Sequence, residues 1–380
     1  LRLVGSEMCI RDSSMQNLIK KNTSNTLYLK LFERQEIKMK KKVMAELEKC
    51  YSIAPLHYKN KDHILVAAEK TDRCILFDTE GNEEETVWEG PGGVMTMVQV
   101  PGTDGQFLAT HKFYSPNDSK EAKIVIATPK DGKWEIRTLA DLPFVHRFDI
   151  LESEGKHYLI ACCLKSGHEY KDDWSSPGKV YAGLLPDDLS GFDEEHQLQL
   201  EVIKDDMLKN HGYYRVVRDG KMSSLVCCDG GVFRFYPPTE ESKEWKVETL
   251  LETPASDATL IDLDGDGKDE LLVLSPFHGD TVLIYKENNG GYQLVYEYPE
   301  KIEFLHAIWS GEIQGKPVVM IGHRKGNRDL LKFYWETGTY HADVIDHDCG
   351  PANAYGFHKD GKDYVISTNR EINQIAMYEF

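Results

Sequence analysis

The chain has 380 residues, of which 41% are hydrophobic and 10% aromatic, which is enough to build a large core. Its formal net charge is -18, and such an acidic surface repels nucleic-acid phosphates and anionic lipid. We therefore expect neither nucleic acid nor a membrane as a partner. No apolar run approaches the roughly 18 residues that span a bilayer, and no secretory signal is apparent, so we expect a cytoplasmic protein.

The first 38 residues differ in character from the rest. Residues 1–13, LRLVGSEMCIRDS, resemble the translated read-through of a sequencing adapter. Residues 14–38 are polar and have no clear periodicity. We interpret residues 1–38 as a non-native or disordered leader. The expected native start is Met39, with Met44 as the alternative.

Beyond the leader, one unit recurs: an apolar strand, a polar turn, a second apolar strand, a loop and two further strands. Runs such as HILVAAE, KHYLIACCL and ELLVLS follow the turns and are short and β-rich. The spacing of about 41 to 65 residues is typical of β-propeller blades. The turns are expected at residues 59–62, 101–105, 152–156, 218–221, 264–268, 312–316 and 359–363. The pattern therefore predicts an all-β, seven-bladed β-propeller in a single domain, residues 42–380.

The last unit contains only three strands before the chain ends at Phe380. A missing fourth strand would leave an open sheet edge. Residues 42–49, KVMAELEK, resemble the outer strands of the other units. We expect them to complete the seventh blade and to close the ring.

Two adjacent cysteine pairs, Cys162–Cys163 and Cys227–Cys228, lie inside apolar strands. Neighbouring side chains on a strand point to opposite faces, so neither pair suggests a disulfide framework. Buried free thiols are expected instead, as in a reducing cytoplasm.

One turn carries the acidic pattern D-x-D-G-D-G-x-x-E, formed by Asp262, Asp264, Asp266 and Glu270. Carboxylates at alternate positions of a glycine-containing turn can surround a hard cation. The run resembles the calcium loop of FG-GAP or VCBS repeats, which are propeller-blade units. The resemblance implies a structural calcium ion at the turn, at the end of the blade opposite the expected ligand-binding mouth.

Three histidines occupy matched positions, about nine residues before the turn glycines of their units. They are His146, His211 and His306. Residues at matched positions of a closed propeller face one axis, and propeller ligands usually bind where the inner strands begin. Three neutral imidazoles suit Zn²⁺, Mn²⁺ or a related ion with an open position for substrate. The alternative is that each imidazole lines the channel, bonded to water or backbone.

A second group of polar residues follows the second strand of several units. Clustered His, Arg, Lys and Tyr side chains in an acidic protein suit an anionic or polyhydroxylated ligand. The longest insertion, residues 165–178, carries Trp174 and is a plausible lid. The alternative is a set of solvated loops. The candidates in this second group are His111, Lys165, His168, Tyr170, His278, His323, Arg324 and Arg370.

The repeated architecture, the channel histidines and the segment GHEY…DDWSSPGKVY resemble propeller-fold polysaccharide lyases and aldos-2-ulose (anhydrofructose) dehydratases. The resemblance implies a carbon–oxygen lyase acting on a uronate-containing oligosaccharide or a keto-sugar, with a metal ion and a base. The implied metal ligands are His146, His211 and His306. The implied acid or base is among His168, Tyr170, Tyr213, His111 and His323, and the implied substrate contacts are Lys165, Trp174, Arg324, Arg370 and Asn353.

The alternative function is a non-catalytic propeller of the FG-GAP or VCBS type that binds carbohydrate or protein. It predicts affinity without turnover and tolerance of replacement of the three channel histidines.

Overall fold

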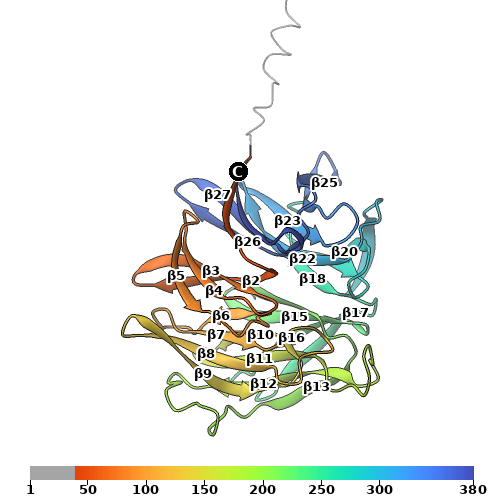
Figure 1. The fold of residues 1–380 in the computed structure, drawn as a ribbon. Coiled ribbons are helices and arrows are strands. Elements are labelled where there is room, and N and C mark those ends of the chain that lie inside the picture. The colour runs from red at the N-terminus through yellow and green to blue at the C-terminus, as the bar shows by residue number, and fades with distance from the viewer. Residues whose placement is uncertain (1–38) are drawn as a thin grey trace, which may run out of the picture. The chain divides into compact units, whose positions relative to one another are not determined.

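The computed structural model describes residues 39–380, so the leader prediction for residues 1–38 lies outside the described residues. Residues Lys40–Phe380 form one compact unit of seven four-stranded antiparallel sheets (Figure 1). Within the described residues the one helical element is the short 3₁₀ helix η1 (Arg370–Ile372). The predicted all-β, seven-bladed β-propeller is therefore confirmed.

Each blade runs from an inner strand at the axis to an outer strand. The first four blades are β2 (Cys50–Tyr58), β3 (Lys61–Ala68), β4 (Cys74–Asp78) and β5 (Glu83–Trp88); β6 (Met97–Gln99), β7 (Phe107–His111), β8 (Lys123–Lys130) and β9 (Lys133–Asp141); β10 (Val145–Ser153), β11 (Lys156–Lys165), β12 (Pro177–Leu185) and β13 (Glu201–Met207); and β14 (Gly212–Arg218), β15 (Lys221–Cys228), β16 (Gly231–Tyr236) and β17 (Lys246–Leu251). The remaining three are β18 (Asp257–Ile261), β19 (Glu270–Ser275), β20 (Thr281–Asn288) and β21 (Gly291–Glu297); β22 (Leu305–Ile313), β23 (Lys316–His323), β24 (Leu330–Glu336) and β25 (Thr339–Asp346); and β26 (Pro351–Lys359), β27 (Lys362–Asn369), β28 (Gln374–Glu379) and β1 (Lys40–Glu46).

The last blade combines both ends of the described chain. β1 pairs antiparallel with β28, with Lys40 opposite Glu379 and Val43 opposite Ala376. Figure 1 shows this first strand, in red, beside the blue C-terminal strands. The strand spans Lys40–Glu46, whereas the sequence pattern suggested residues 42–49. β1 fills the fourth position of a blade that β26, β27 and β28 leave one strand short.

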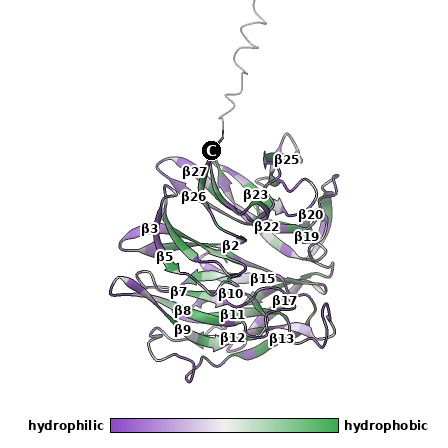
Figure 2. Ribbon diagram, in the orientation of Figure 1, coloured by the Kyte–Doolittle hydropathy of each residue, from purple (hydrophilic) through white to green (hydrophobic). Residues whose placement is uncertain are grey.

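The second strand of each blade is packed on both faces by neighbouring blades, which explains its continuous apolar sequence. In β11 and β15 the last six residues are all buried, and they include Cys162, Cys163, Cys227 and Cys228. All four are free thiols, as predicted. Outer strands such as β17 and β21 are mostly exposed. Figure 2 shows this contrast as hydrophobic colour along the middle strands and hydrophilic colour in the turns.

All seven predicted turns join the inner strand of a blade to its second strand. Matched sequence positions consequently occupy matched places in the ring, and the residues at the start of each inner strand converge on the axis. No helix in residues 39–380 is long and apolar enough to cross a membrane.

Candidate functional site

The three histidines that the repeat pattern aligned lie together at the axis. His146 is in β10, His306 is in β22, and His211 directly precedes β14. All three are at most 3% exposed. The ring centroid of His211 is 4.6 Å from that of His146 and 5.3 Å from that of His306. The structure thus brings the predicted channel histidines into one buried cluster.

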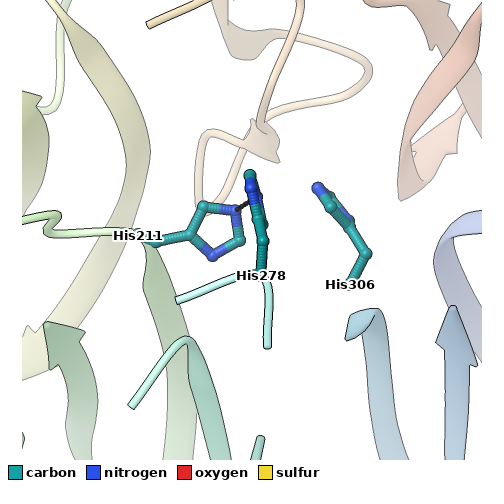
Figure 3. Close-up of side chains that lie close together, drawn as sticks. All are labelled: His211, His278 and His306. Carbon is teal, nitrogen blue, oxygen red and sulfur yellow. Dashed lines mark hydrogen bonds between the residues drawn. The ribbon is translucent and has the colours of Figure 1, made fainter. Parts of the chain in front are cut away.

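A fourth imidazole, His278, joins them from the loop between β19 and β20. Its Nε2 atom lies 3.2 Å from Nε2 of His211. One ring nitrogen from each of His211, His278 and His306 lies within 4.8 Å of the others, and Figure 3 shows the three rings facing one another. His146 lies outside this group of potential ligands. The sequence interpretation had placed His278 near the channel without making it a ligand, because its loop position is not shared with the other blades.

Hydrogen bonds fix which ring nitrogen is available on two of these histidines. Nδ1 of His211 lies 3.0 Å from Oδ2 of the buried Asp257 and 3.2 Å from the carbonyl oxygen of Ser256. Nδ1 of His306 donates to the carbonyl oxygen of Ala352 at 2.7 Å. Because Nδ1 carries the proton in each case, Nε2 keeps its lone pair. A carboxylate behind a ligand histidine is a common arrangement at metal centres.

These residues fit a divalent transition metal. Zn–N bonds of about 2.0–2.1 Å in a tetrahedral site separate ligand nitrogens by roughly 3.3 Å, close to the spacing between His211 and His278. A ligand imidazole must also be neutral. Burial lowers the pKa of His278 and His306 well below the ordinary value, and neighbouring imidazole and guanidinium groups add to this effect. Both rings are therefore unprotonated near neutral pH, as metal binding requires.

Aromatic rings hold His278 in place. Its ring stacks on Phe277 at a centroid distance of 4.0 Å and on Phe304 at 4.3 Å, with 24° between the planes in both cases. The ring of Trp174 packs edge-on against that of Phe277, with 5.5 Å between the ring centroids. The insertion at residues 165–178 therefore reaches the histidine cluster through Phe277, and Trp174 contributes to its cover.

Below the cluster lies a cavity of about 670 Å³, hereafter the channel cavity. His306, Asp257 and Arg147 line it where the inner strands begin, and Glu152 and His157 line it where they end. We had expected ligands to bind at the end where the inner strands begin. The cavity instead extends along the axis toward the turns, while aromatic side chains pack against the histidines at the other end.

Two further polar side chains connect the cluster with the channel cavity. The hydroxyl of Tyr51 lies 3.0 Å from Nε2 of His306, and burial raises the pKa of Tyr51 to about 12. Arg147 donates to the carbonyl oxygen of Met95 at 2.7 Å and lies over the Tyr51 ring at 5.8 Å. Sequence reasoning did not select either residue. Tyr51 lies at the start of the inner strand β2, and Arg147 directly follows His146. Their place at the start of inner strands was the available signal.

The predicted acid and base candidates are dispersed. Tyr213 lines the channel cavity and donates to Asp149 at 3.0 Å. His168 packs against Phe144, and Tyr170 is 67% exposed. His111 is buried against Trp88 of the neighbouring blade. His323 accepts from the backbone of Asp329 and shapes the loop between β23 and β24.

The predicted substrate contacts are similarly divided. Asn353 lines the channel cavity and donates to the carbonyl oxygen of Tyr51 at 2.8 Å. Lys165 is fully buried, with its ammonium group 2.7 Å from the carbonyl oxygen of Asp173 and over the Trp174 ring. Arg324 and Arg370 both donate to Glu371, and Arg370 also pairs with Glu69. Of these four residues, Asn353 alone faces the channel cavity.

The acidic turn before β19 holds a lysine. Oxygens of Asp262, Asp264 and Glu270 lie within 4.8 Å of one another. The ammonium group of Lys286 is 2.5 Å from Asp264, 2.7 Å from Asp266 and 3.2 Å from Glu270. Asp262 accepts from the backbone N–H of Gly265 and Gly267. A cation of the protein itself therefore contacts three of the four carboxylates predicted to bind calcium.

Comparison with known proteins bears on the fold. No protein-family model matches the chain, and no curated protein matches it. Among solved structures, the chain is similar to the β-propeller domain of Cps50 (Swd1) from Myceliophteria thermophila, with a TM-score of 0.57 and 9% sequence identity over 89% of this chain and 99% of that one. At this identity the similarity supports the seven-bladed β-propeller fold alone.

Proposed function

We propose that the chain is a metal-dependent carbon–oxygen lyase that acts on a uronate-containing oligosaccharide or a keto-sugar. The observation that carries this proposal is the convergence of nitrogens from His211, His278 and His306 beside the channel cavity, which His306 lines. Cavities of this size accommodate small-molecule ligands. The expected metal is Zn²⁺ or Mn²⁺, because imidazole ligands suit both ions.

A divalent ion held by these three histidines would supply a Lewis acid that stabilises negative charge on a substrate carboxylate or carbonyl oxygen. Arg147 lines the same end of the cavity and is positioned to bind that carboxylate. Its charge adds to the positive potential where an enolate-like intermediate would form.

His146 and Tyr51 are the proposed proton-transfer groups. Nδ1 of His146 donates to the carbonyl oxygen of His211 at 3.1 Å, so Nε2 keeps a lone pair. Burial lowers the pKa of His146 well below its ordinary value, so the ring is unprotonated at neutral pH. In the proposed β-elimination, His146 takes the proton from the substrate carbon next to the carboxylate. The electrons of that C–H bond form the new carbon–carbon double bond, and the bond from the neighbouring carbon to the leaving oxygen breaks. The phenol of Tyr51 protonates the departing oxygen.

The seven cysteines in residues 39–380 are buried free thiols. This supports our proposal that the protein works in a reducing compartment such as the cytoplasm.

Elemental analysis of the purified protein, combined with ultraviolet detection of unsaturated products, tests the proposal. One equivalent of transition metal and product formation are expected. His211→Gln should lose both the bound metal and product formation, whereas His146→Gln should keep the metal and lose turnover. His196→Gln is the matched control, since that side chain is 71% exposed. A protein without stoichiometric transition metal contradicts the metal mechanism, and bound metal with sugar affinity but no turnover favours a non-catalytic binding propeller.

A further inference from the structure

A second hollow adjoins the channel cavity at the end of the inner strands. This hollow, about 690 Å³, lies between β26 of the last blade and β2 and β3 of the first. We call it the turn-end groove. The two spaces share Pro55, Gln99 and Tyr355 as wall residues. The groove also has walls formed by His57, His63, Glu80, Phe357 and Lys359. A chain-like ligand that passes these shared residues would occupy both spaces.

Two aromatic residues that line the turn-end groove, Tyr355 and Phe357, belong to a row of stacked rings that ends with Tyr364 outside the lining. Tyr355 and Phe357 lie 16° from parallel at a centroid distance of 6.4 Å. Phe357 in turn lies 17° from parallel with Tyr364, at 5.2 Å. All three side chains are half-buried. Sugar rings present C–H groups with partial positive charge, and the negative face of an aromatic ring attracts them.

The polar groups of the groove are paired with one another. His57 lies 2.9 Å from Asp62, and His63 lies 2.8 Å from Glu84. Lys359 pairs with Glu80 and donates to Thr79 at 2.7 Å. Such pairs offer donors and acceptors side by side, which suits hydroxyl groups.

The charge of the groove argues against a polyanionic ligand. Among the described residues that line it, four are carboxylates (Asp62, Asp78, Glu80 and Glu84) and two are lysines (Lys61 and Lys359). The whole chain carries a formal net charge of -18. A polyuronate would therefore meet net repulsion here, whereas a neutral sugar would not.

We propose that the turn-end groove binds neutral sugar units of an oligosaccharide whose terminal unit enters the channel cavity and reaches the histidine cluster. The part concerning the terminal unit rests on the proposed function. The binding of neutral sugars in the groove does not require turnover. The inference narrows the substrate class to chains with a single reactive end and an uncharged remainder.

The test uses a glycan array that carries neutral glycans and polyuronates of increasing length. Binding to the array is measured for the wild-type chain, Phe357→Ala and Tyr334→Ala. Tyr334 is the matched control, because it is a half-buried aromatic residue stacked on His341 in a different blade. We expect binding of neutral glycans to rise with length. Phe357→Ala should weaken the binding of the longer glycans by about threefold to tenfold, because one aromatic contact is lost. The metal content should be unchanged.

The outcomes separate this inference from the proposed function. Length-dependent binding of neutral glycans that Phe357→Ala weakens supports the groove, even if the protein shows no metal and no turnover. Binding that does not depend on length, a preference for polyuronates, or equal losses in Phe357→Ala and Tyr334→Ala overturns it, even if a monosaccharide is turned over.

Discussion

The Nδ1 atom of His211 lies 3.0 Å from Oδ2 of Asp257, and both side chains are buried at the start of adjacent inner strands. The carboxylate fixes the tautomer of His211 and directs its Nε2 atom toward His278. Asp257→Ala should therefore weaken transition-metal binding by about 10- to 100-fold, the usual effect of losing such a partner. Chelator competition followed by elemental analysis measures this change.

Asp257→Asn provides a graded comparison, since its amide oxygen can still accept from Nδ1 of His211. Asn should consequently retain more metal than Ala. Asp343→Asn, at a half-exposed position on the outer strand β25, serves as the neutral control. Equal metal affinity in Asp257→Ala and the wild-type chain would mean that Asp257 does not position His211.

The repeat pattern was sufficient to predict the fold and part of the cluster. Seven turns at regular spacing place matched residues at one axis, so His146, His211 and His306 could be connected across more than 150 positions of sequence. The need for a fourth strand in the last blade likewise follows from the unpaired edge it would otherwise have.

Side chains on loops could not be predicted in this way. His278 reaches the cluster from a loop, where it has a positive φ and stacks on Phe277 of the same loop and on Phe304, which directly precedes β22. Arg324 and Arg370 appeared available for a substrate carboxylate, but Glu371 and Glu69 neutralise them. Lys286 contacts the acidic turn from a neighbouring strand 20 residues away from Asp266. Pairings of this kind depend on packing that a local motif does not contain.

Buried His111 should make the protein less stable in mild acid. Burial lowers the pKa of His111 to about 4 from an ordinary value of 6.5, so the folded state binds this proton less readily than the unfolded state. Its contribution to stability is present above pH 6.5 and is lost as the pH falls toward 4, with a size on the order of 3 kcal/mol. Urea unfolding of the wild-type chain and His111→Phe at neutral pH and at mildly acidic pH should show a smaller acid loss in the variant.

Other groups titrate in the same range, so the difference between the two proteins is the informative quantity. His196→Phe is the control, because this side chain is 71% exposed and its replacement should leave the acid loss unchanged. If His111→Phe loses as much stability between neutral and mildly acidic pH as the wild-type chain does, His111 is not the source of the acid sensitivity.

Lys286 should make the acidic turn independent of calcium. Burial opposes the charge of Lys286, but its hydrogen bonds to Asp264, Asp266 and Glu270 raise its pKa overall. Thermal unfolding of the wild-type chain should therefore be the same with chelator and with millimolar calcium. Lys286→Met leaves the carboxylates without a counter-charge and should lower the free energy of unfolding by about 1–2 kcal/mol.

Calcium should restore stability to Lys286→Met, because oxygens of Asp262, Asp264 and Glu270 already lie within 4.8 Å of one another. Lys301→Met removes a lysine that is 60% exposed and should respond to calcium as the wild-type chain does. A clear stabilisation of the wild-type chain by calcium would show that the ion displaces Lys286, as the FG-GAP or VCBS resemblance implies.

The first strand should contribute measurably to ring stability. A chain beginning at Met44 lacks the paired residues Lys40, Lys41, Lys42 and Val43 of β1. It also lacks the ion pair between Lys41 and Asp346 at 2.5 Å. With about four backbone hydrogen bonds lost and the edge of β28 exposed, the free energy of unfolding should fall by roughly 2–4 kcal/mol. A chain beginning at Met39 should unfold at the same denaturant concentration as the full sequence, since it retains β1. Equal stability of the Met39 and Met44 chains would mean that the pairing of β1 with β28 adds little to ring closure.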